Sequence, residues 1–324
     1  MILLYQGEKF DANFYYQSGI TIDHSFLLLN ENEKNKNTKN TEKTLFVYNM
    51  NEAIARANFN GEVVAAQDIF KELEKCIKGK KIGFDGASIS ANMAKKLSTM
   101  CKLEDRSLDL IQKRAKKTEE EVQKIKRAAQ KTREIFELLD FKKAKTELDL
   151  KKQIALATVD MGLEAAFEPI VATDESSAYP HYTPENKKLG KWVLIDYGVK
   201  YEHYCSDLTR CFTLDGNKKM KSEYETLQNT CSEIIDSLVH AKKGKDVAKI
   251  AEDRVKKAGF PKMIHSIGHG VGLDIHELPR LGTKSEDRIA QTVIAIEPAF
   301  YYNGKYGMRY EETVYFDGKK AKIL

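Results

Sequence analysis

The stretch IHSIGHGVGLDIHE, residues 264–277, gathers an unusual share of the chain's chemistry-bearing side chains. The chain has seven histidines, and three of them stand here between closely spaced glycines: His265, His269 and His276, with Gly268, Gly270 and Gly272. Imidazole is the commonest neutral metal ligand at physiological pH, and glycine lets a backbone approach an ion or a substrate closely. We therefore take this stretch as the first candidate for a chemical site.

Length and charge limit the class of protein. A chain of 324 residues is long enough for two domains of roughly 100–200 residues each. The 53 Lys and Arg residues are nearly balanced by 48 Asp and Glu residues, which leaves a formal net charge of +5. Nucleic-acid binding requires a basic stripe on one face. We expect a solvated surface of mixed charge and no nucleic-acid partner.

No feature of the sequence predicts export or a membrane span. The first residues, MILLYQGEKFDANFYY, lack the basic region and apolar core of a signal peptide. No apolar run reaches the roughly 18 residues of a membrane helix. The five cysteines are odd in number and form no C-x-x-C pair, which favours reduced thiols in a cytoplasmic protein.

Residues 1–113 are predicted to form a small α/β domain. Apolar runs at 25–30, 44–50 and 80–86 predict strands, and residues 62–77 and 88–100 have helical spacing. The segment 30–43, NENEKNKNTKNTEK, has no apolar residue and is expected to form a mobile hairpin or loop tip. This order of elements predicts at least partly parallel strand pairing.

Residues 114–324 are predicted to form a second, larger domain. Thr118 with Glu121 is a capping box and marks the start of a helix that extends to about residue 140. Further helices are expected at 146–162, 219–241 and 246–258, with apolar extended segments between and after them. A duplicated plan of two helices and then strands fits this order.

Four carboxylates stand within or beside apolar strands of the second domain. They are Asp196, Asp207, Glu297 and Glu311. A buried carboxylate is costly unless it is paired or bound to a cation. Each one alone can be explained by a basic partner or an exposed strand edge. Together with a glycine-flanked histidine they indicate a shared cation site.

The ligand chemistry predicts which ions this site takes. Carboxylates and an imidazole favour Mn²⁺, Co²⁺ or Fe²⁺ over a thiolate-type zinc site. More carboxylates than one ion needs indicate a pair of ions. We expect two divalent ions, Mn²⁺ first, with Co²⁺, Fe²⁺ or Zn²⁺ as alternatives.

The candidate ligands also carry a family resemblance. Asp196, Asp207, His269, Glu297 and Glu311 occur in order within IDYG, CSDLTR, HSIGHGVG, AIEP and MRYEE. This pattern resembles the pita-bread metallopeptidases, which include prolidase, aminopeptidase P and methionine aminopeptidase. The resemblance implies an α+β protein with a C-terminal pita-bread (creatinase/aminopeptidase-like) catalytic domain at 114–324 and a smaller creatinase/prolidase-like α/β domain at 1–113. It also implies a homodimer.

The resemblance assigns a role to each matching metal ligand. It implies that Asp196 chelates one ion, while Asp207 and Glu311 bridge both ions. It implies that His269 and Glu297 complete the second ion's ligands, and that Glu297 takes a proton from a bridging water. Glu312 is expected to orient one of these ligands.

Two further histidines match substrate-side positions of the family. His181, in YPHYTP, matches a substrate-side histidine, although Tyr182 stands where glycine often follows. His276 matches the histidine that hydrogen-bonds the peptide and stabilises the tetrahedral intermediate. For His265 we favour a packing role over substrate contact, and we expect His203 in a surface turn.

The resemblance is nearest to the prolidase and aminopeptidase P branch. A short connection from Glu297 to Glu311 and the extra N-terminal domain both favour it over methionine aminopeptidase. Arg280 is placed like an arginine that grips the free carboxylate of a dipeptide, although a surface ion pair explains it too. The expected function is hydrolysis of the peptide bond before proline in dipeptides or short peptides, by a metal-bridging hydroxide.

Four alternatives to an Xaa-Pro dipeptidase stay open. The nearest is aminopeptidase P activity on longer Xaa-Pro-Yaa peptides, followed by a methionine aminopeptidase-like enzyme. A non-catalytic binding relative and a creatinase-type amidinohydrolase are less favoured, because all five ligand positions carry competent residues.

Overall fold

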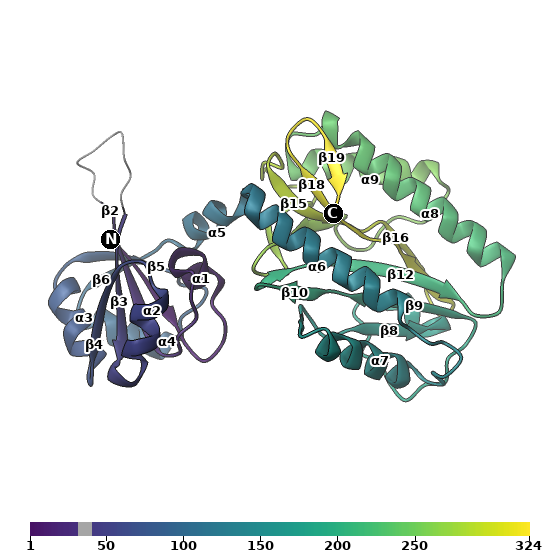
Figure 1. The fold of residues 1–324 in the computed structure, drawn as a ribbon. Helices are drawn as coiled ribbons and strands as arrows, with labels where there is room; N and C mark the ends of the chain where they lie inside the picture. Colours follow the sequence, from purple (N-terminus) through teal and green to yellow (C-terminus); the bar gives the residue numbers. More distant parts are fainter. Residues whose placement is uncertain (32–40) are drawn as a thin grey trace. The chain divides into compact units, whose positions relative to one another are not determined.

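A computed structural model describes residues 1–31 and 41–324. The chain divides into two compact units, Met1–Lys113 and Arg114–Leu324 (Figure 1). Most of the polar segment that we predicted to be a hairpin or loop tip, namely residues 32–40, lies outside the described residues.

The first unit is built on a mixed six-stranded sheet in the order β4-β3-β2-β1-β5-β6. Its strands are β1 (Ile2–Gln6), β2 (Ser25–Glu31), β3 (Thr41–Tyr48), β4 (Glu62–Ala66), β5 (Lys81–Phe84) and β6 (Lys102–Asp105). Strand β1 pairs antiparallel with β2 and β2 with β3, whereas β3–β4, β1–β5 and β5–β6 are parallel. The predicted partly parallel pairing is therefore confirmed.

Helices cover both faces of this sheet because successive strand residues alternate between its faces. On β2, Leu27 and Leu29 pack in one apolar core, while Phe26 and Leu28 pack in the other. The helices are α1 (Ala12–Ser18), α2 (Glu52–Asn58), α3 (Ile69–Ile77), α4 (Ala91–Ser98) and α5 (Ser107–Ala115). Residues of α1, α2 and α5 join the first core, and residues of α3 and α4 join the second.

The prediction of one helix over residues 62–77 was wrong. The segment divides into strand β4 and helix α3. Residues 62–66 pair with residues 44–48 of β3, and this tertiary pairing overrides the helical spacing of the apolar residues. Asp68 then starts α3, because its side chain accepts a hydrogen bond from the backbone N–H of Lys71.

The second unit contains four long helices among antiparallel strands. They are α6 (Glu119–Glu137), α7 (Glu147–Asp160), α8 (Lys218–Asp236) and α9 (Gly244–Lys257). Thr118 and Glu121 form the predicted capping box, and Thr146 caps α7 in the same way with Asp149. The four helices were predicted from the sequence, and all four are confirmed to within a few residues.

The strands of this unit form several small sheets. Strands β8 (Ile170–Thr173), β9 (Trp192–Tyr197) and β12 (Leu208–Thr213) form one sheet, and β7 (Glu164–Ala165), β10 (Val199–Tyr201) and β11 (Tyr204–Cys205) form another. The largest has the order β14-β13-β15-β18-β19, from β13 (Gly268–Gly270), β14 (Glu277–Arg280), β15 (Thr292–Ile296), β18 (Glu312–Phe316) and β19 (Ala321–Ile323). A hairpin of β16 (Ala299–Tyr302) and β17 (Tyr306–Arg309) connects β15 to β18.

Two helix pairs cover two of these sheets in the same manner (Figure 1). Helices α6 and α7 share an apolar core with β8, β9 and β12, and α8 and α9 share one with β15 and β18. On β9, Val193, Ile195 and Tyr197 enter the helix-facing core. Because strand side chains alternate, Asp196 points to the opposite face, away from α6 and α7.

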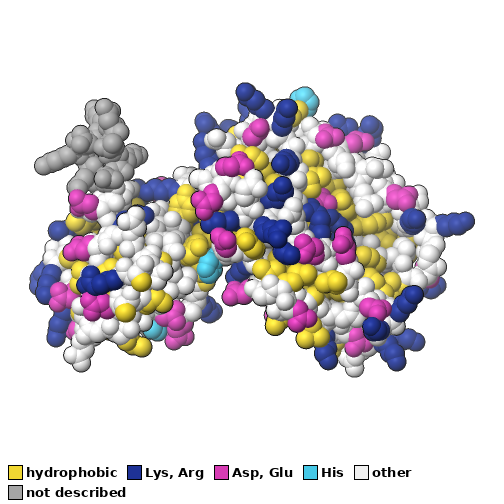
Figure 2. All heavy atoms as spheres, in the orientation of Figure 1, with side chains coloured by type: hydrophobic (Ala, Val, Ile, Leu, Met, Phe, Trp, Pro, Cys, Tyr) yellow, Lys and Arg dark blue, Asp and Glu magenta, His cyan; other side chains and the backbone are white. Residues whose placement is uncertain are grey.

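The surface charge and the character of the helices can be compared with the expectations from composition. On the face shown in Figure 2, basic and acidic side chains are interspersed over the second unit. Over residues 1–31 and 41–324, no helix has the length and apolar character that a bilayer crossing needs.

The core beneath α6 generates a stability prediction. Ile135 is fully buried against α7 and the β9 sheet, so Ile135→Ala should lower the free energy of unfolding by about 2–5 kcal/mol through lost burial and a cavity. Arg127 is exposed on the same helix, and Arg127→Ala should change it by less than about 0.5 kcal/mol. Urea denaturation followed by circular dichroism measures both, and equal shifts would contradict this packing.

Candidate metal centre

A pocket of about 410 Å³ in the second unit collects most of the predicted site residues. Its lining contains all five candidate ligands and both substrate-side histidines: Asp196, Asp207, His269, Glu297, Glu311, His181 and His276. An apolar wall completes it: Phe167, Ile170, Pro180 and Ile275. Residues more than 100 positions apart in the sequence thus share one concave site, as substrate sites usually require.

Strand ends place the carboxylates. Asp196 lies on β9. Asp207 lies between β11 and β12, and β12 pairs with β9. Glu297 directly follows β15 and Glu311 directly precedes β18, so the β16–β17 hairpin begins and ends at a carboxylate. The backbone N–H of Glu311 donates to the carbonyl of Thr209 at 3.3 Å, which fixes the hairpin base against β12.

His269 presents a free ring lone pair to a carboxylate. Its Nδ1 lies 3.1 Å from the carbonyl oxygen of Gly270, and a carbonyl can only accept, so Nδ1 carries the proton. Nε2 then has the lone pair and lies 3.4 Å from Oδ2 of Asp207. Two acceptors that face each other need a cation between them, and the backbone contact fixes the tautomer that binds one.

The ligand atoms lie close enough to bind one ion. One ligand atom each from Asp207, His269 and Glu311 lies within 4.8 Å of the other two. Oδ1 of Asp196 and Oδ1 of Asp207 are buried and have no hydrogen-bond partner among the described residues. Unpartnered buried carboxylate oxygens are costly, and a bound cation would satisfy them. These residues therefore fit a divalent metal.

Burial and mutual repulsion raise the pKa of two of these carboxylates. Burial, together with Asp196 and Glu297, raises the pKa of Asp207 well above its ordinary value. Burial and the same neighbouring acids, with Asp207, raise the pKa of Glu311. Positive charge in the pocket would reverse both shifts, as bound cations do in metal sites.

Arg309 supplies positive charge beside these acids, and we did not predict its role. The Arg309 side chain is buried, and its Nη2 donates to Oδ2 of Asp196 at 2.6 Å. Its Nε donates to Oγ1 of Thr209 at 3.0 Å, and Thr209 donates in turn to Oε2 of Glu311 at 2.7 Å. An arginine two residues before Glu311 in MRYEE was the available sequence signal.

A hydrogen-bond chain extends from Arg309 to His265. Arg309 Nη1 donates to the Tyr301 hydroxyl at 2.8 Å, and that hydroxyl lies 3.0 Å from Nε2 of His265. Nδ1 of His265 lies 2.7 Å from the carbonyl of Ser266 and must carry the proton, so Nε2 accepts from Tyr301. Both ring nitrogens of His265 are thus engaged, although the ring also lines the pocket.

His181 and His276 form the accessible wall of the pocket. Both residues are exposed, and the His276 ring lies 4.3 Å from the His269 ring, centre to centre. Partial burial lowers the pKa of His276, and the neighbouring His269 and His181 lower it further. A neutral imidazole at this position can donate or accept a hydrogen bond.

A buried carboxylate holds the loop that carries His181. Glu147 is fully buried and accepts hydrogen bonds from the backbone N–H groups of Thr173, at 2.9 Å, and Glu185, at 3.0 Å. The loop between them includes His181. Glu147 lies at the start of α7, so the loop is anchored to a helix end.

Three expectations about nearby residues need comment. Arg280 ends β14 with an exposed side chain and, of the described residues, is not one that lines this pocket. The carboxylate-binding role of Arg280 stays a prediction.

The carboxylate of Glu312 forms ion pairs with Arg210 at 2.5 Å and with Arg133 at 2.6 Å. Arg210 also donates a hydrogen bond to the backbone carbonyl of Glu311 at 2.7 Å. His203 lies in a turn between β10 and β11, but it is half-buried rather than at the surface.

Two glycines of the opening stretch allow close contacts between neighbouring strands. A Cβ at Gly268 would lie 1.9 Å from the carbonyl oxygen of Ala295, and one at Gly270 would lie 2.2 Å from that of Leu278. These glycines therefore let β13 fit between β14 and β15. The close approach of this stretch to a metal or substrate stays a prediction.

This fold and this carboxylate-rich pocket define a pita-bread metallopeptidase. The model of metallopeptidase family M24 matches residues 123–317, and the chain belongs to this family. The family resemblance and the α+β fold class predicted from the sequence are thus confirmed.

Similar proteins support this membership. The chain is 34% identical to an uncharacterized peptidase of Methanocaldococcus jannaschii. The match extends over 210 residues, 60% of this chain and 59% of that protein. It is 29% identical to the Xaa-Pro dipeptidase of Pyrococcus furiosus over 97% of this chain and 90% of that protein.

Solved structures resemble the whole described fold. The P. furiosus prolidase matches with a TM-score of 0.85 and 26% identity over 99% of this chain and 95% of that chain. An X-Pro aminopeptidase from Thermotoga maritima matches with a TM-score of 0.87 and 25% identity over 100% of this chain and 95% of that chain.

The raised pKa of Asp207 generates a pH prediction for metal-stripped protein. Its pKa is raised above the ordinary 3.8 in the folded state, so the folded state holds the proton more tightly, and that stability is lost as the pH rises through the folded pKa. The melting temperature should fall as the pH rises above about 4, the ordinary pKa of an aspartate, and it should fall less in Asp207→Asn. The exposed Asp160 offers a control, since Asp160→Asn should follow the wild type.

Differential scanning fluorimetry over this pH range measures the effect. Added Mn²⁺ should raise the melting temperature of the wild type more than that of Asp207→Asn, because metal binding stabilises the folded state. The same slope in wild type and Asp207→Asn would contradict the assignment of the pH-dependent instability to Asp207.

Proposed function

We propose that this chain is a metal-dependent Xaa-Pro peptidase that acts as an Xaa-Pro dipeptidase. The observation that carries this proposal is the convergence of five candidate ligands, two accessible histidines and an apolar wall on one pocket. The named activities of the P. furiosus and T. maritima relatives support the substrate class.

The proposed metal ligands are Asp196, Asp207, His269, Glu297 and Glu311. Two divalent ions held there would supply Lewis acidity and lower the pKa of water. The neutral tautomer of His269 and the unpartnered oxygens of the two aspartates fit this role.

In this proposal Glu297 also transfers a proton, and the two pocket histidines bind the peptide. Glu297 is half-buried at the pocket wall, where its carboxylate can take a proton from attacking water and return it to the leaving amine. His276 and His181 can donate hydrogen bonds to a carbonyl oxygen as negative charge develops on it.

The apolar wall suits proline. A peptide bond before proline is a tertiary amide without an N–H, so the pocket needs no acceptor for that position. Phe167, Ile170, Pro180 and Ile275 can bury the pyrrolidine ring instead.

Aminopeptidase P activity is the second candidate. The relatives include proteins named for each activity, and the proposed discriminator, Arg280, is exposed at the end of β14. An arginine that binds the carboxylate of a dipeptide selects dipeptides, because a longer peptide has no carboxylate at that position.

Three finer proposals accompany the activity. Mn²⁺ is the proposed ion, because oxygen ligands dominate the site. A homodimer follows from the family resemblance, and a sizing column tests it. All five cysteines are free thiols, which supports a reducing, cytoplasmic location.

Loss of the Asp207 or Glu311 carboxylate, each a proposed metal ligand, should strongly reduce hydrolysis while the fold is kept. We expect Asp207→Asn and Glu311→Gln to lower kcat/KM for Met-Pro by at least about 100-fold, since even the loss of an outer partner of a metal ligand costs about 10–100-fold. The assay uses stripped protein reloaded with Mn²⁺, Co²⁺ or Zn²⁺, with circular dichroism as the fold control. Full activity in either variant contradicts the two-ion site, and preferential cleavage of Met-Ala indicates a methionine aminopeptidase.

Arg280 should separate dipeptides from longer peptides. Arg280→Ala should raise KM for Met-Pro about tenfold, the loss expected for one charge-assisted contact, with little change for a Met-Pro-Yaa tripeptide. Arg254 is a partly exposed arginine on α9, and Arg254→Ala is the control that should leave both KM values unchanged. Equal losses on both substrates would remove the carboxylate-binding role of Arg280.

A further inference from the structure

The tetrapeptide Asp274-Ile275-His276-Glu277 lines the pocket with some of its residues and binds a buried arginine with the others. Its two inner residues, Ile275 and His276, line the pocket. Its two outer residues, Asp274 and Glu277, bind the same arginine, Arg114. The proposed substrate-binding histidine therefore lies between two anchored carboxylates.

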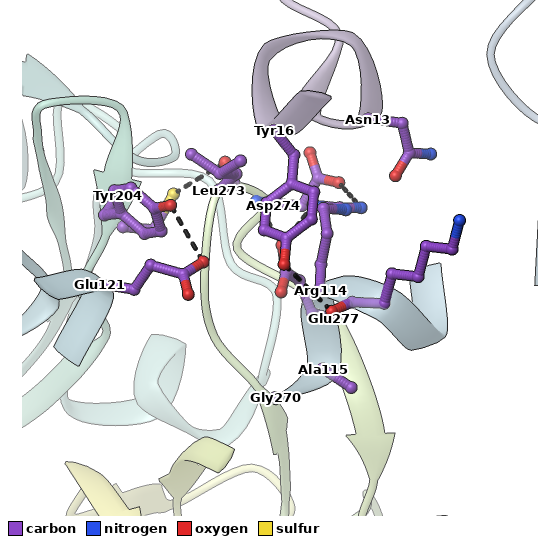
Figure 3. Close-up of polar contacts among 12 residues, drawn as sticks. Asn13, Tyr16, Arg114, Ala115, Glu121, Tyr204, Gly270, Leu273, Asp274 and Glu277 are labelled. Atoms are coloured by element: carbon purple, nitrogen blue, oxygen red, sulfur yellow. Dashed lines mark hydrogen bonds and ion pairs between the residues drawn. The ribbon is translucent and has the colours of Figure 1, made fainter. Parts of the chain in front are cut away.

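Arg114 spans this tetrapeptide with its guanidinium fork (Figure 3). Nη1 donates to Oε1 of Glu277, and Nη2 donates to Oδ2 of Asp274 at 2.9 Å. The backbone N–H of Asp274 also donates to Oε1 of Glu277 at 3.1 Å, which closes the turn on itself. A planar fork can hold two carboxylates in a fixed relation, and a lysine cannot.

Lys117 holds the second oxygen of Glu277. Its Nζ donates to Oε2 of Glu277 at 2.9 Å and to the carbonyl of Arg114 at 2.6 Å. The Lys117 backbone N–H donates to the carbonyl of Gln291 at 2.8 Å, and the next residue, Thr118, caps α6. The two cations therefore lie on a segment that is itself fixed to the start of α6 and to the turn before β15.

Burial makes these contacts strong and specific. The side chains of Arg114, Lys117 and Glu277 are 4%, 1% and 1% exposed, whereas that of Asp274 is 50% exposed. A Cβ at Gly272 would lie 2.3 Å from Oε2 of Glu277, so the carboxylate packs directly on the backbone of the same loop. Buried charges that keep their partners restrict a loop to one conformation, and the loss of one partner is costly.

We propose that Arg114 and Lys117 are positioning residues for His276, which they orient toward the scissile carbonyl through Glu277 and Asp274. This proposal rests on the proposed function of the pocket. Among the described residues, Arg114 and Lys117 do not line the pocket, whereas the contacts given above join them to Asp274 and Glu277 on either side of His276. Their effect on the reaction is therefore predicted to pass through the loop that carries His276.

A double-mutant cycle tests this path. Arg114→Lys keeps the charge and removes the fork, so kcat for Met-Pro should fall about 10–100-fold, as for a misplaced catalytic contact, with KM changed less. In a His276→Ala background the same substitution should change kcat less than about twofold, because the group that it positions is gone. A general loss of structure would lower kcat by the same factor in both backgrounds and would overturn the proposal.

The matched control is Arg254→Lys. Arg254 on α9 is also forked, between Glu233 at 3.1 Å and Ser237 at 3.4 Å, and it lies outside the Asp274–Glu277 loop. Its replacement should change kcat less than about twofold in either background. If Arg114→Lys does not fold, Asp274→Asn removes one arm at its half-exposed end and enters the same cycle.

Hydrogen exchange separates this proposal from the proposed function. Amides of residues 271–277 should exchange faster in Arg114→Lys than in wild type, while those of β15 and those in Arg254→Lys should not change. If exchange in the loop is unchanged, the positioning role is wrong whatever the activity. If metal-loaded wild type cleaves no Xaa-Pro peptide, the proposed function fails, and the exchange result alone decides whether the two cations hold the loop.

Discussion

The cost of burying several carboxylates side by side is the constraint on which the rest of the second unit depends. Asp207 and Glu311 are buried beside two further acids, and each raises the cost of ionising the others. Arg309 offsets part of this charge through Asp196. The sheets, the helix pairs and the β16–β17 hairpin hold these carboxylates together against that repulsion. A bound cation would offset the repulsion, so the same arrangement favours metal binding.

Hydrogen-bond satisfaction separates two kinds of buried acid in this unit. Glu147 and Glu277 are fully supplied with donors, and each anchors a loop that carries a pocket histidine. Asp196 and Asp207 each retain a buried oxygen without a donor among the described residues. The first kind is structural, and the second kind marks a place where a cation fits. Burial alone does not distinguish them.

Much of the fold and the ligand set was predictable because their causes are local in sequence. The capping box of Thr118 with Glu121 and the acids inside apolar strands can each be recognised from a few neighbouring residues. The strand at 62–66 was missed because its pairing with β3 is a tertiary interaction. Partners of Arg309, Glu147 and Glu277 were missed for the same reason, since Asp196, Thr173 and Arg114 lie 113, 26 and 163 positions away from them in the sequence. The glycines were noticed, but which backbone they approach depends on sheet order.

The β16–β17 hairpin limits where the chain can gain or lose residues without moving the pocket carboxylates. Its two bases carry Glu297 and Glu311, and the pairing from Ala299 with Arg309 to Tyr302 with Tyr306 fixes their relation. Residues added within a strand would shift that register and turn alternate side chains to the other face. Residues added at the turn 303–305 would leave both bases in place. The tip is thus the point at which related chains, or an engineered one, can gain or lose sequence while the carboxylate geometry is kept.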